Sequence, residues 1–421
     1  MAAIKPFQAI FYNKEKIENI SDVICPPYDV ISKEQQESYY KQNTYNFIRL
    51  EFGKDAPKDN AKDNKYVRAR KMYEEWLKKG ILKQEDTPCV YFYKQDYKYF
   101  GQKYTRTGFL ALLNIGDDSG VKILPHENTQ PLAKTDRHLL WTSLKSNLSA
   151  VFIGYPDHSN FVDKMFLKEF ASQKPYLEAV DHDKVKHAVW RLDDPVKIQQ
   201  ISNIIDGKNL YICDGHHRFE VANQIRRDML KKSKNPTGKE PYNFVMAYFT
   251  NMDSKDLQIF PIHRIVKKFP ISVNLLEQYF RIDKIKNKTD LLVLLARAGQ
   301  NEHAFGLCVK SGMYLLRLKS RTLIDKLAME GSKDYKDLDA AILKVFIFDQ
   351  VGVQPDDIVY SKDPSEVMAA VEEARADAGF ILNPVKIKQL KAVAQNNERM
   401  PPKTTYFYPK VLSGLTMYKI E

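Results

Sequence analysis

Residues 209–227, NLYICDGHHRFEVANQIRR, limit the local fold more tightly than any other part of the chain. The apolar run Leu210–Ile212 has the composition of a buried strand. From Phe219 onward, apolar residues recur at three- and four-residue spacing while charged residues take the other faces, which predicts an amphipathic helix. Because Gly215 allows a sharp turn, the pattern predicts a strand that passes directly into a helix.

The turn between this strand and this helix has the composition of an anion site. The first turn of a helix presents unpaired N–H groups and the positive end of the helix dipole. Phosphate is the natural occupant of such a turn here, where it would be held by Gly215, His216, His217 and Arg218. Asp214 would repel that phosphate unless it holds a cation or takes a proton.

Plainer interpretations of the same residues exist. Asp214 could cap the helix, and two adjacent histidines at a helix start could be surface residues. Cys213, His216 and His217 could also belong to a zinc site. No C-x-x-C motif or second Cys/His cluster completes four zinc ligands, however, so the phosphate interpretation is favoured.

The composition is that of an ordinary folded protein. The chain has 421 residues, of which 43% are hydrophobic and 28% are charged, which is enough for two or three domains. It has four scattered cysteines and no apolar run of signal-peptide or membrane-spanning length. We therefore expect a cytoplasmic protein with reduced thiols and no membrane partner.

The net charge of +12 at first suggests a nucleic-acid partner. Lys and Arg are interleaved with Asp and Glu, however, and the chain has no zinc-finger spacing, basic zipper or ribonucleoprotein signature. Small anionic substrates explain the excess charge equally well, so we do not expect nucleic acid to be the partner. No pattern in the sequence specifies an oligomeric state.

Two loops carry candidate acidic residues. In the segment CPPYDVI two prolines hold the backbone extended, so Asp29 would be held rigidly, either for function or as part of a structural turn. The predicted strand Val121–Leu124 ends in PHENT, where His126, Glu127 and Thr129 follow a strand end. Glu127 could accept a proton from a substrate hydroxyl, although an ordinary loop glutamate is the simpler interpretation.

Two arginines are further candidate phosphate ligands. Residues 90–114 predict a β-hairpin with a long turn near residues 96–102. Arg106 lies on its second strand and could reach a phosphate, although an exposed strand arginine is the simpler interpretation. Arg137 lies in the first turn of a helix predicted over residues 135–147.

The pattern divides the chain into three parts. Residues 1–268 contain the motifs above, and residues 269–399 alternate between helical and strand patterns, which predicts a second α/β domain. Residues 400–421 begin MPPKTTYFYPK and are rich in hydroxyl groups and lysines. We expect this last segment either to fold back over the site and supply anion donors or to be a surface extension.

Four motifs together resemble a family long labelled a domain of unknown function. They are CPPYDVI, PHENT, DGHHRFEVA and MPPKTTYFYPKVLSGL, and they occur in the order of that family, so the resemblance covers almost the whole chain. Within it, DGHHR resembles the phosphate motif of the ParB/sulfiredoxin superfamily, which includes kinases that phosphorylate free L-serine. The set as a whole resembles pyrophosphate-dependent serine kinases.

The resemblance implies an α/β (α+β) fold with a ParB/sulfiredoxin-like catalytic region and a second α/β domain. It implies transfer of a phosphoryl group from pyrophosphate to L-serine, which gives O-phospho-L-serine and phosphate. An aspartate of the D-G-H motif and a glutamate at a strand end are expected to be catalytic. Asp214 matches the first, and Glu127 is assigned to the second, with Asp29 as the competing candidate. Asp214 is then expected to bind Mg²⁺ that bridges the donor phosphates.

Contacts to serine and phosphate are expected from His126, Thr129, Lys403, Thr404 and Thr405. The chain lacks the G-x-x-x-x-G-K-S/T loop, the G-x-G-x-x-G motif and the protein-kinase signature, so nothing in it requires a nucleotide donor. One alternative is a serine kinase that uses ADP or ATP. Another is a non-enzymatic ParB-like regulator that senses a phosphorylated ligand or nucleic acid, and the lack of a recognisable helix-turn-helix counts against it.

Overall fold

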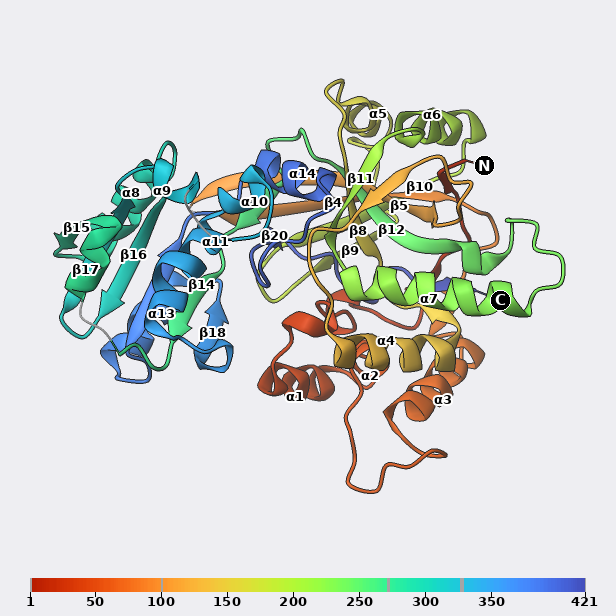
Figure 1. Ribbon diagram of the computed structural model, residues 1–421. Helices are drawn as coiled ribbons and strands as arrows, with labels where there is room; N and C mark the ends of the chain where they lie inside the picture. Colours follow the sequence, from red (N-terminus) through yellow and green to blue (C-terminus); the bar gives the residue numbers. More distant parts are fainter. Residues whose placement is uncertain (1, 100, 271–272, 326–328, 421) are drawn as a thin grey trace. The chain divides into compact units, whose positions relative to one another are not determined.

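The computed structural model describes residues 2–99, 101–270, 273–325 and 329–420 (Figure 1). The chain divides into two compact units, each built from separate stretches of sequence. The first unit contains Met1–Leu124, Thr129–Leu257 and Pro409–Glu421, and the second contains Pro125–Asn128 and Gln258–Tyr408. The boundary that the sequence suggested after residue 268 thus lies after residue 257, and the C-terminal segment divides after residue 408.

A mixed β-sheet forms the centre of the first unit. Its strands are β1 (Ile4–Lys5), β4 (Val90–Tyr99), β5 (Gln102–Asn114), β6 (Lys122–Leu124), β8 (Val151–Tyr155), β9 (Leu177–Val180), β10 (Lys186–Leu192), β11 (Asn209–Asp214) and β12 (Phe244–Asn251). They lie in the order β6-β11-β8-β12-β5-β4-β10-β9, and β1 pairs with β5. The pairs β11/β6 and β12/β8 are parallel, whereas β11/β8, β12/β5 and β4/β5 are antiparallel.

Helices surround this sheet. They are η1 (Ile20–Asp22), η2 (Tyr28–Val30), α1 (Lys33–Gln42), α2 (Ile48–Glu51), α3 (Lys65–Lys78), α4 (Pro131–Leu144), α5 (Phe161–Glu169), α6 (Pro195–Ile205), α7 (His216–Lys232) and η3 (Pro241–Asn243). Two small ribbons complete the unit, β2 (Ile10–Tyr12) with β3 (Leu82–Gln84) and β7 (Ser146–Asn147) with β21 (Tyr418–Lys419). Helix α4 packs against α3 and α7.

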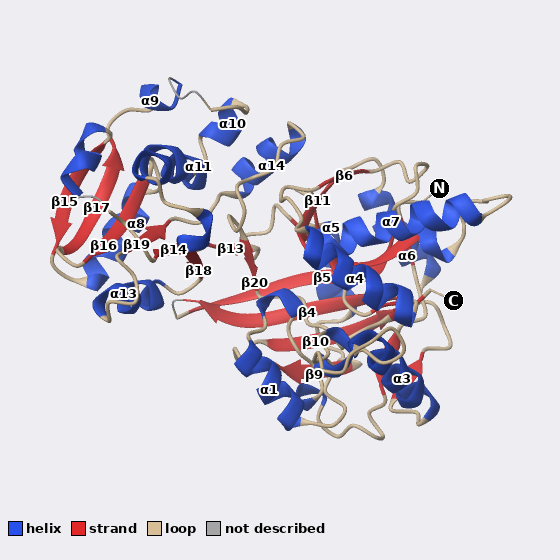
Figure 2. Ribbon diagram, turned by 60° about the horizontal axis from the view of Figure 1, so that its bottom comes forward, coloured by secondary structure: helices blue, strands red, loops and turns tan. Residues whose placement is uncertain are grey.

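The two faces of the sheet have different partners because side chains alternate along each strand. On one face, Phe92 and Phe109 belong to an apolar core that also contains side chains of α5 and α6. The other face carries Gln95, Arg106 and Tyr248, which are all buried. Gln95 is on β4, Arg106 on β5 and Tyr248 on β12. Figure 2 shows β4 and β5 side by side with β10.

From Pro409 onward, the C-terminal segment belongs to the first unit. Isolated bridges join Ser413 to Cys25 and Met417 to Ile10. Leu415 and Met417 are almost completely buried. Residues 411–417 are all buried, so this part of the chain fills part of the core of the unit and is not a surface extension.

The predicted hairpin and the predicted helix near Arg137 both form, with different limits. Strand β4 continues to Tyr99 and β5 begins at Gln102, so most of the expected long turn is strand; Phe100 lies outside the described residues. Helix α4 begins at Pro131, earlier than expected, because proline is well suited to the first helical position.

The second unit is built on an antiparallel sheet. Its strands are β14 (His263–Val266), β15 (Phe280–Ile285), β16 (Ala304–Val309), β17 (Gly312–Leu318), β18 (Ile358–Ser361) and β19 (Ala378–Leu382), in the order β15-β17-β16-β19-β14-β18. Strand β13 (Gln258–Phe260) pairs with β20 (Tyr406–Tyr408), which joins the two ends of this unit. Pro261 separates β13 from β14, because proline has no N–H to donate to a strand ladder.

Helices cover both faces of this second sheet, and each face has its own apolar core. They are η4 (Val273–Gln278), α8 (Lys288–Ala298), α9 (Thr322–Asp325), α10 (Lys333–Lys336), α11 (Asp339–Leu343), the π-helical turn η5 (Lys344–Phe348), α12 (Asp349–Val351), η6 (Pro355–Asp357), α13 (Pro364–Glu372) and α14 (Ile387–Gln395). The α/β (α+β) class is thus confirmed. No described helix is both long enough and apolar enough to cross a membrane.

Candidate functional site

The corner between β11 and α7 is made by Asp214 and Gly215. Strand β11 ends at Asp214 and α7 begins at His216, with Gly215 between them at a φ of +85°. A Cβ atom on Gly215 would lie 2.8 Å from Nε of Arg218. Glycine is therefore needed both for the left-handed backbone and because the Arg218 side chain folds back over it. The predicted strand, turn and helix are confirmed.

Two cations hold the Asp214 carboxylate. Its Oδ1 atom accepts a hydrogen bond from Nζ of Lys410 at 2.8 Å, and its Oδ2 atom accepts one from Nη2 of Arg218 at 2.9 Å. Arg218 also donates through Nη1 to the carbonyl oxygen of Ala150, so its position is fixed from two directions. The side chains of Asp214, Arg218 and Lys410 are 15%, 9% and 10% exposed, which keeps this ion cluster largely out of water.

The electrostatics of this cluster favour an anion. Burial alone would raise the pKa of Asp214, but the charges of Lys410 and Arg218 outweigh burial and hold that pKa well below its usual range. The carboxylate is therefore ionised at neutral pH and is bound by two cations. These cations lie at the N-terminus of α7, where the helix dipole also favours negative charge. Ammonium and guanidinium groups have several donors each, so the cluster can bind phosphate oxygens.

The two histidines of the turn have different surroundings. His216 is buried and lies close enough to Asp214 to lower the pKa of that carboxyl. His217 accepts, through Nε2, a hydrogen bond of 2.9 Å from the main-chain N–H of Gln130. His216 thus belongs to the ion cluster, whereas His217 binds the chain segment that leads into α4.

Thr129, which the sequence suggested as a substrate contact, lies in the first unit beside α7. Its hydroxyl donates to Oε2 of Glu220 at 2.6 Å, and Nζ of Lys134 lies 3.2 Å from the same oxygen. Both contacts anchor the start of α4 to the first turns of α7.

The CPPYDVI loop lies close to Arg218. Burial raises the pKa of Tyr28, Asp29 raises it further, and the charges of Arg137 and Arg218 lower it. The Arg137 guanidinium lies 3.9 Å from the centre of the Tyr28 ring. Asp29 itself is exposed, in η2. The first motif and the DGHHR motif are therefore neighbours within one unit.

Arg137, a predicted phosphate ligand, is buried and bound by carboxylates. Its Nη1 atom donates to the carbonyl oxygen of Glu51 at 2.9 Å and lies 3.6 Å from Oε1 of the same residue. It also forms an ion pair with Asp136, and the Ser149 hydroxyl donates to Glu51 at 3.0 Å. The charge of Arg137 is thus already balanced by Glu51 and Asp136 inside the protein.

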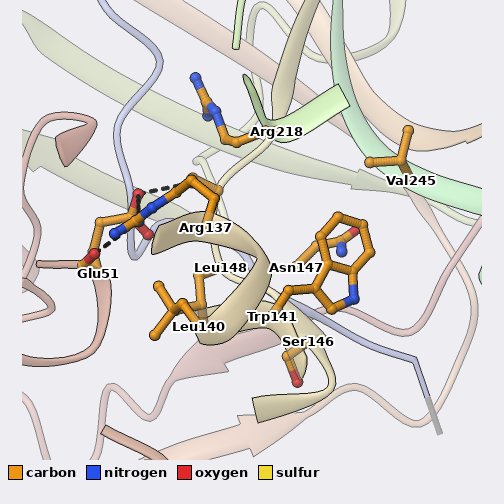
Figure 3. Close-up of a pocket in the computed structure, with 10 residues that line it drawn as sticks. Glu51, Arg137, Leu140, Trp141, Ser146, Asn147, Leu148, Arg218 and Val245 are labelled. Atoms are coloured by element: carbon orange, nitrogen blue, oxygen red, sulfur yellow. Dashed lines mark hydrogen bonds and ion pairs between the residues drawn. The ribbon is translucent and has the colours of Figure 1, made fainter. Parts of the chain in front are cut away.

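A small cavity lies beside Arg137 and Arg218, and Glu51 and Trp141 also line it (Figure 3). Its volume is about 40 Å³. That space is of the order of one water molecule and is too small for pyrophosphate or serine. This cavity therefore cannot be the binding site of either substrate.

The burial of Arg106 differs most clearly from what the sequence predicted. Arg106 is neither an exposed strand arginine nor accessible to a dissolved phosphate, because it is only 1% exposed. Its guanidinium lies 4.7 Å from the centre of the Phe152 ring and 5.6 Å from that of Tyr248. It donates hydrogen bonds to Gln95 and to the carbonyl oxygen of Pro409.

His126 and Glu127 belong to the second unit, where they contact residues 400–405 of the C-terminal segment. Nε2 of His126 lies 2.9 Å from the Thr405 hydroxyl, and the same hydroxyl lies 3.5 Å from Oε1 of Glu127. The main-chain N–H of Met400 donates to the carbonyl oxygen of His126 at 2.8 Å. The PHENT and MPPKTT motifs are thus neighbours, although 278 positions separate Glu127 from Thr405.

The neighbouring residues Lys403 and Thr404 differ in exposure. Lys403 is exposed and has a positive φ of 54°. Thr404 is buried, and its hydroxyl donates to the carbonyl oxygen of Pro401. Lys403 is therefore accessible to an anion, whereas the hydroxyl of Thr404 stabilises its own turn.

The donors available to a metal ion are few. Within the part of the chain that the structure describes, no group of three or more His, Cys, Asp and Glu side chains is arranged to hold a metal. Asp214 contributes a single carboxylate, which fits Mg²⁺ only as an ion shared with substrate phosphates and water. Lys410 and Arg218 hold the same carboxylate and would compete with the ion. Mg²⁺ at Asp214 stays a prediction.

Sequence reasoning did not single out Lys410, although this residue stands in the C-terminal motif as part of YFYPK. Glu51 was also missed. The signal that could have found Lys410 is chemical. Asp214 beside an anion site needs a cation, and of the four motifs only the C-terminal one contains lysines. The position of Glu51 had no such signal, because its partner Arg137 lies on a different helix.

A family model described as "Protein of unknown function (DUF1015)" matches residues 4–341 of the chain. No curated protein matches it. Similar solved structures include a conserved hypothetical protein from Pyrococcus furiosus, with a TM-score of 0.35, 13% identity, and coverage of 71% of this chain and 92% of that chain.

Two further structures are similar at the same level. One is a free serine kinase in complex with AMP, with a TM-score of 0.34, 12% identity, and coverage of 68% of this chain and 83% of that chain. The other is SbnI with a C-terminal truncation, from Staphylococcus aureus, with a TM-score of 0.37, 10% identity, and coverage of 72% and 85%. Because these scores are low, the chemistry of this chain has to be argued from its own residues.

Proposed function

The chain belongs to the DUF1015 family of proteins of unknown function, and we propose that it is a kinase that transfers a phosphoryl group from pyrophosphate to free L-serine. The products are O-phospho-L-serine and phosphate. The observation that supports this proposal most directly is the cluster of Asp214, Lys410 and Arg218 at the N-terminus of α7. The resemblance of the DGHHR motif to the phosphate motif of free-serine kinases supports the choice of serine.

Phosphoryl transfer depends mainly on positioning and charge neutralisation. In the proposed reaction the serine Oγ atom attacks one phosphorus atom of pyrophosphate, the bridging P–O bond breaks, and phosphate leaves with the bonding electrons. Lys410, Arg218 and the first turn of α7 bind the donor oxygens and neutralise the charge that develops there. Asp214 keeps both cations in place and would hold Mg²⁺, which supplies further charge neutralisation when bound.

The serine hydroxyl must lose its proton during the attack. We propose that Glu127 is the general base that accepts this proton, with Asp29 as the competing candidate. Glu127 shares the Thr405 hydroxyl with His126 in the second unit, and Asp29 is exposed beside Tyr28 in the first. His126, Thr129, Lys403, Thr404 and Thr405 remain the proposed contacts to serine and phosphate.

The test is a comparison of phosphoryl donors. The full chain is incubated with L-serine, Mg²⁺ and either pyrophosphate, ADP or ATP, and O-phospho-L-serine is measured by ³¹P NMR. We expect product with pyrophosphate. Product with ADP or ATP but not with pyrophosphate would leave a serine kinase and refute the donor. No product with any donor, together with a salt-dependent DNA shift, would favour the regulatory alternative.

A further inference from the structure

Two buried side chains of the first unit hold the main chain from which Lys410 projects. Gln95 on β4 lies directly opposite Arg106 on β5 in the register of the two strands. Arg106 donates through Nε to Oε1 of Gln95 at 3.0 Å and also donates to the carbonyl oxygen of Pro409. Gln95 donates through Nε2 to the carbonyl oxygen of Lys410 at 2.8 Å. We infer that Arg106 and Gln95 are positioning residues that place Lys410 on Asp214.

The chemistry of Arg106 suits this role. A planar guanidinium has five N–H donors in a fixed arrangement, so it can bind a side-chain oxygen and a main-chain oxygen together, which an ammonium group does less well. The rings of Phe152 and Tyr248 attract its charge, which makes burial of the cation tolerable. Gly108 leaves room for the Tyr248 ring, because a Cβ atom there would lie 2.6 Å from it.

The orientation of Gln95 follows from the same contacts. Its oxygen must face the arginine, which only donates, and its amide nitrogen must face a carbonyl oxygen. On the far side of Gln95, Nδ1 of His187 lies 3.4 Å from Nε2 of Gln95 and 2.6 Å from the Tyr93 hydroxyl. Burial lowers the pKa of His187, so this imidazole is neutral and does not repel Arg106. Arg106 beside the oxygen and His187 beside the nitrogen therefore keep the Gln95 carboxamide in one orientation.

The consequence concerns the side chain of Lys410. A lysine has a long flexible side chain, so its ammonium group stays at a carboxylate only if its main chain is well placed. Two consecutive carbonyl oxygens, those of Pro409 and Lys410, are held by Arg106 and Gln95. Arg106, which sequence analysis assigned to phosphate binding, thus acts on phosphate through Lys410. The inference depends on the proposed function in one respect only, the choice of pyrophosphate as the ligand.

The first test needs no activity. The full chain is treated with an amine-acetylating reagent, and the acetylation rate of each lysine is followed by mass spectrometry. Lys410 is expected to react slowly, because its side chain is 10% exposed and bound to Asp214. Arg106→Gln is expected to increase the rate at Lys410 by about tenfold, the factor that corresponds to one charge-assisted hydrogen bond. The exposed Lys403 should keep its rate and serves as the internal reference.

A matched control is available in the second unit. Arg264 is also buried, lies 4.8 Å from the centre of the Tyr360 ring, and donates to the carbonyl oxygen of Ile262. Arg264→Gln should leave the acetylation rate of Lys410 unchanged. An unchanged rate at Lys410 in Arg106→Gln, or an equal increase in Arg264→Gln, would overturn the inference. If Arg106→Gln does not fold, Gln95→Met removes the donor to Lys410 and takes its place, with the same expected result.

The second test measures pyrophosphate affinity by calorimetry in a double-mutant cycle. Arg106→Lys and Lys410→Met should each weaken binding by about tenfold. If Arg106 acts through Lys410, the double variant should bind no more weakly than Lys410→Met alone. Additive losses would refute the positioning role. Unchanged affinity in Lys410→Met, together with faster acetylation of Lys410 in Arg106→Gln, would refute the proposed function and support the positioning role.

Discussion

The ammonium group of Lys410 lies 2.8 Å from Oδ1 of Asp214, although 196 positions separate these residues in the chain. The contact joins the end of the DGHHR strand to the C-terminal motif within one compact unit. Because Arg218 holds the other carboxylate oxygen, the aspartate organises two cations at the N-terminus of one helix. If this corner binds phosphate as proposed, these two cations compensate the negative charge of the aspartate.

Asp214→Asn removes the charge that organises this cluster. An amide oxygen can still accept one hydrogen bond, so the fold should persist, with the free energy of unfolding lower by roughly 1–2 kcal/mol. Phosphoserine formation should fall by roughly 10²-fold or more. The measurements are urea denaturation and ³¹P NMR. Asp117→Asn, which affects an exposed ion pair with Arg226, is the matched control. Activity of Asp214→Asn equal to that of the control would contradict a catalytic role.

Gly215→Ala tests whether the Arg218 side chain must fold back over Gly215. The new Cβ atom would meet the Arg218 guanidinium at 2.8 Å, and the φ of +85° would be strained. Gly207→Ala is the matched control, because Gly207 has a φ of +73° and no heavy atom near the position of its Cβ. Both variants should lose about 1–2 kcal/mol of stability from strain. A loss of pyrophosphate affinity should occur only in Gly215→Ala; equal affinities in the two variants would argue against a role for Arg218.

Glu127→Gln separates proton transfer from binding. If Glu127 is the general base, this variant should lower kcat by about 10²-fold or more and change the affinity for serine little. Asp29→Asn is the competing variant, since Asp29 is exposed next to Tyr28. Steady-state kinetics with varied serine provide the measurement. If Asp29→Asn lowers kcat and Glu127→Gln does not, the base has been assigned to the wrong residue.

The free energy of unfolding should depend on pH because His303 is charged in the folded protein. Its Nδ1 atom lies 2.8 Å from Asp339, and its Nε2 atom lies 3.1 Å from Asp337. Burial lowers the pKa of His303, but the two carboxylates outweigh burial and raise it above its usual value. The stabilisation from this group is therefore fully present below the unfolded pKa of about 6.5 and is lost as pH rises through the folded pKa.

We expect the stability difference between the native protein and His303→Asn to be larger near pH 6 than near pH 8.5, as measured by urea denaturation at each pH. His263 serves as a control, because its contribution to stability should have the opposite pH dependence. Burial lowers its pKa to about 4, so its contribution is lost as pH falls from about 6.5 toward that value. A difference for His303→Asn that grows with pH would contradict the assigned ion pairs.

Residues that are adjacent in the chain determine much of the turn between β11 and α7. Leu210–Ile212 and the helical spacing after Phe219 predicted β11 and α7, and Gly215 predicted the turn between them. These features follow from residues that are adjacent in the chain, because side-chain periodicity and backbone freedom are local properties. The same reasoning predicted that β4 and β5 form a hairpin, which places Gln95 opposite Arg106.

Only the tertiary structure decided what covers these elements. The hairpin register and the alternation along β4 and β5 put Gln95 and Arg106 on one face but cannot tell whether that face meets water. The arginine is buried, and the carbonyl oxygen of Pro409 accepts one of its hydrogen bonds. The partner of Asp214 was undetermined for the same reason. Contacts between residues 196 positions apart depend on how the whole chain packs, and no local pattern in the sequence encodes them.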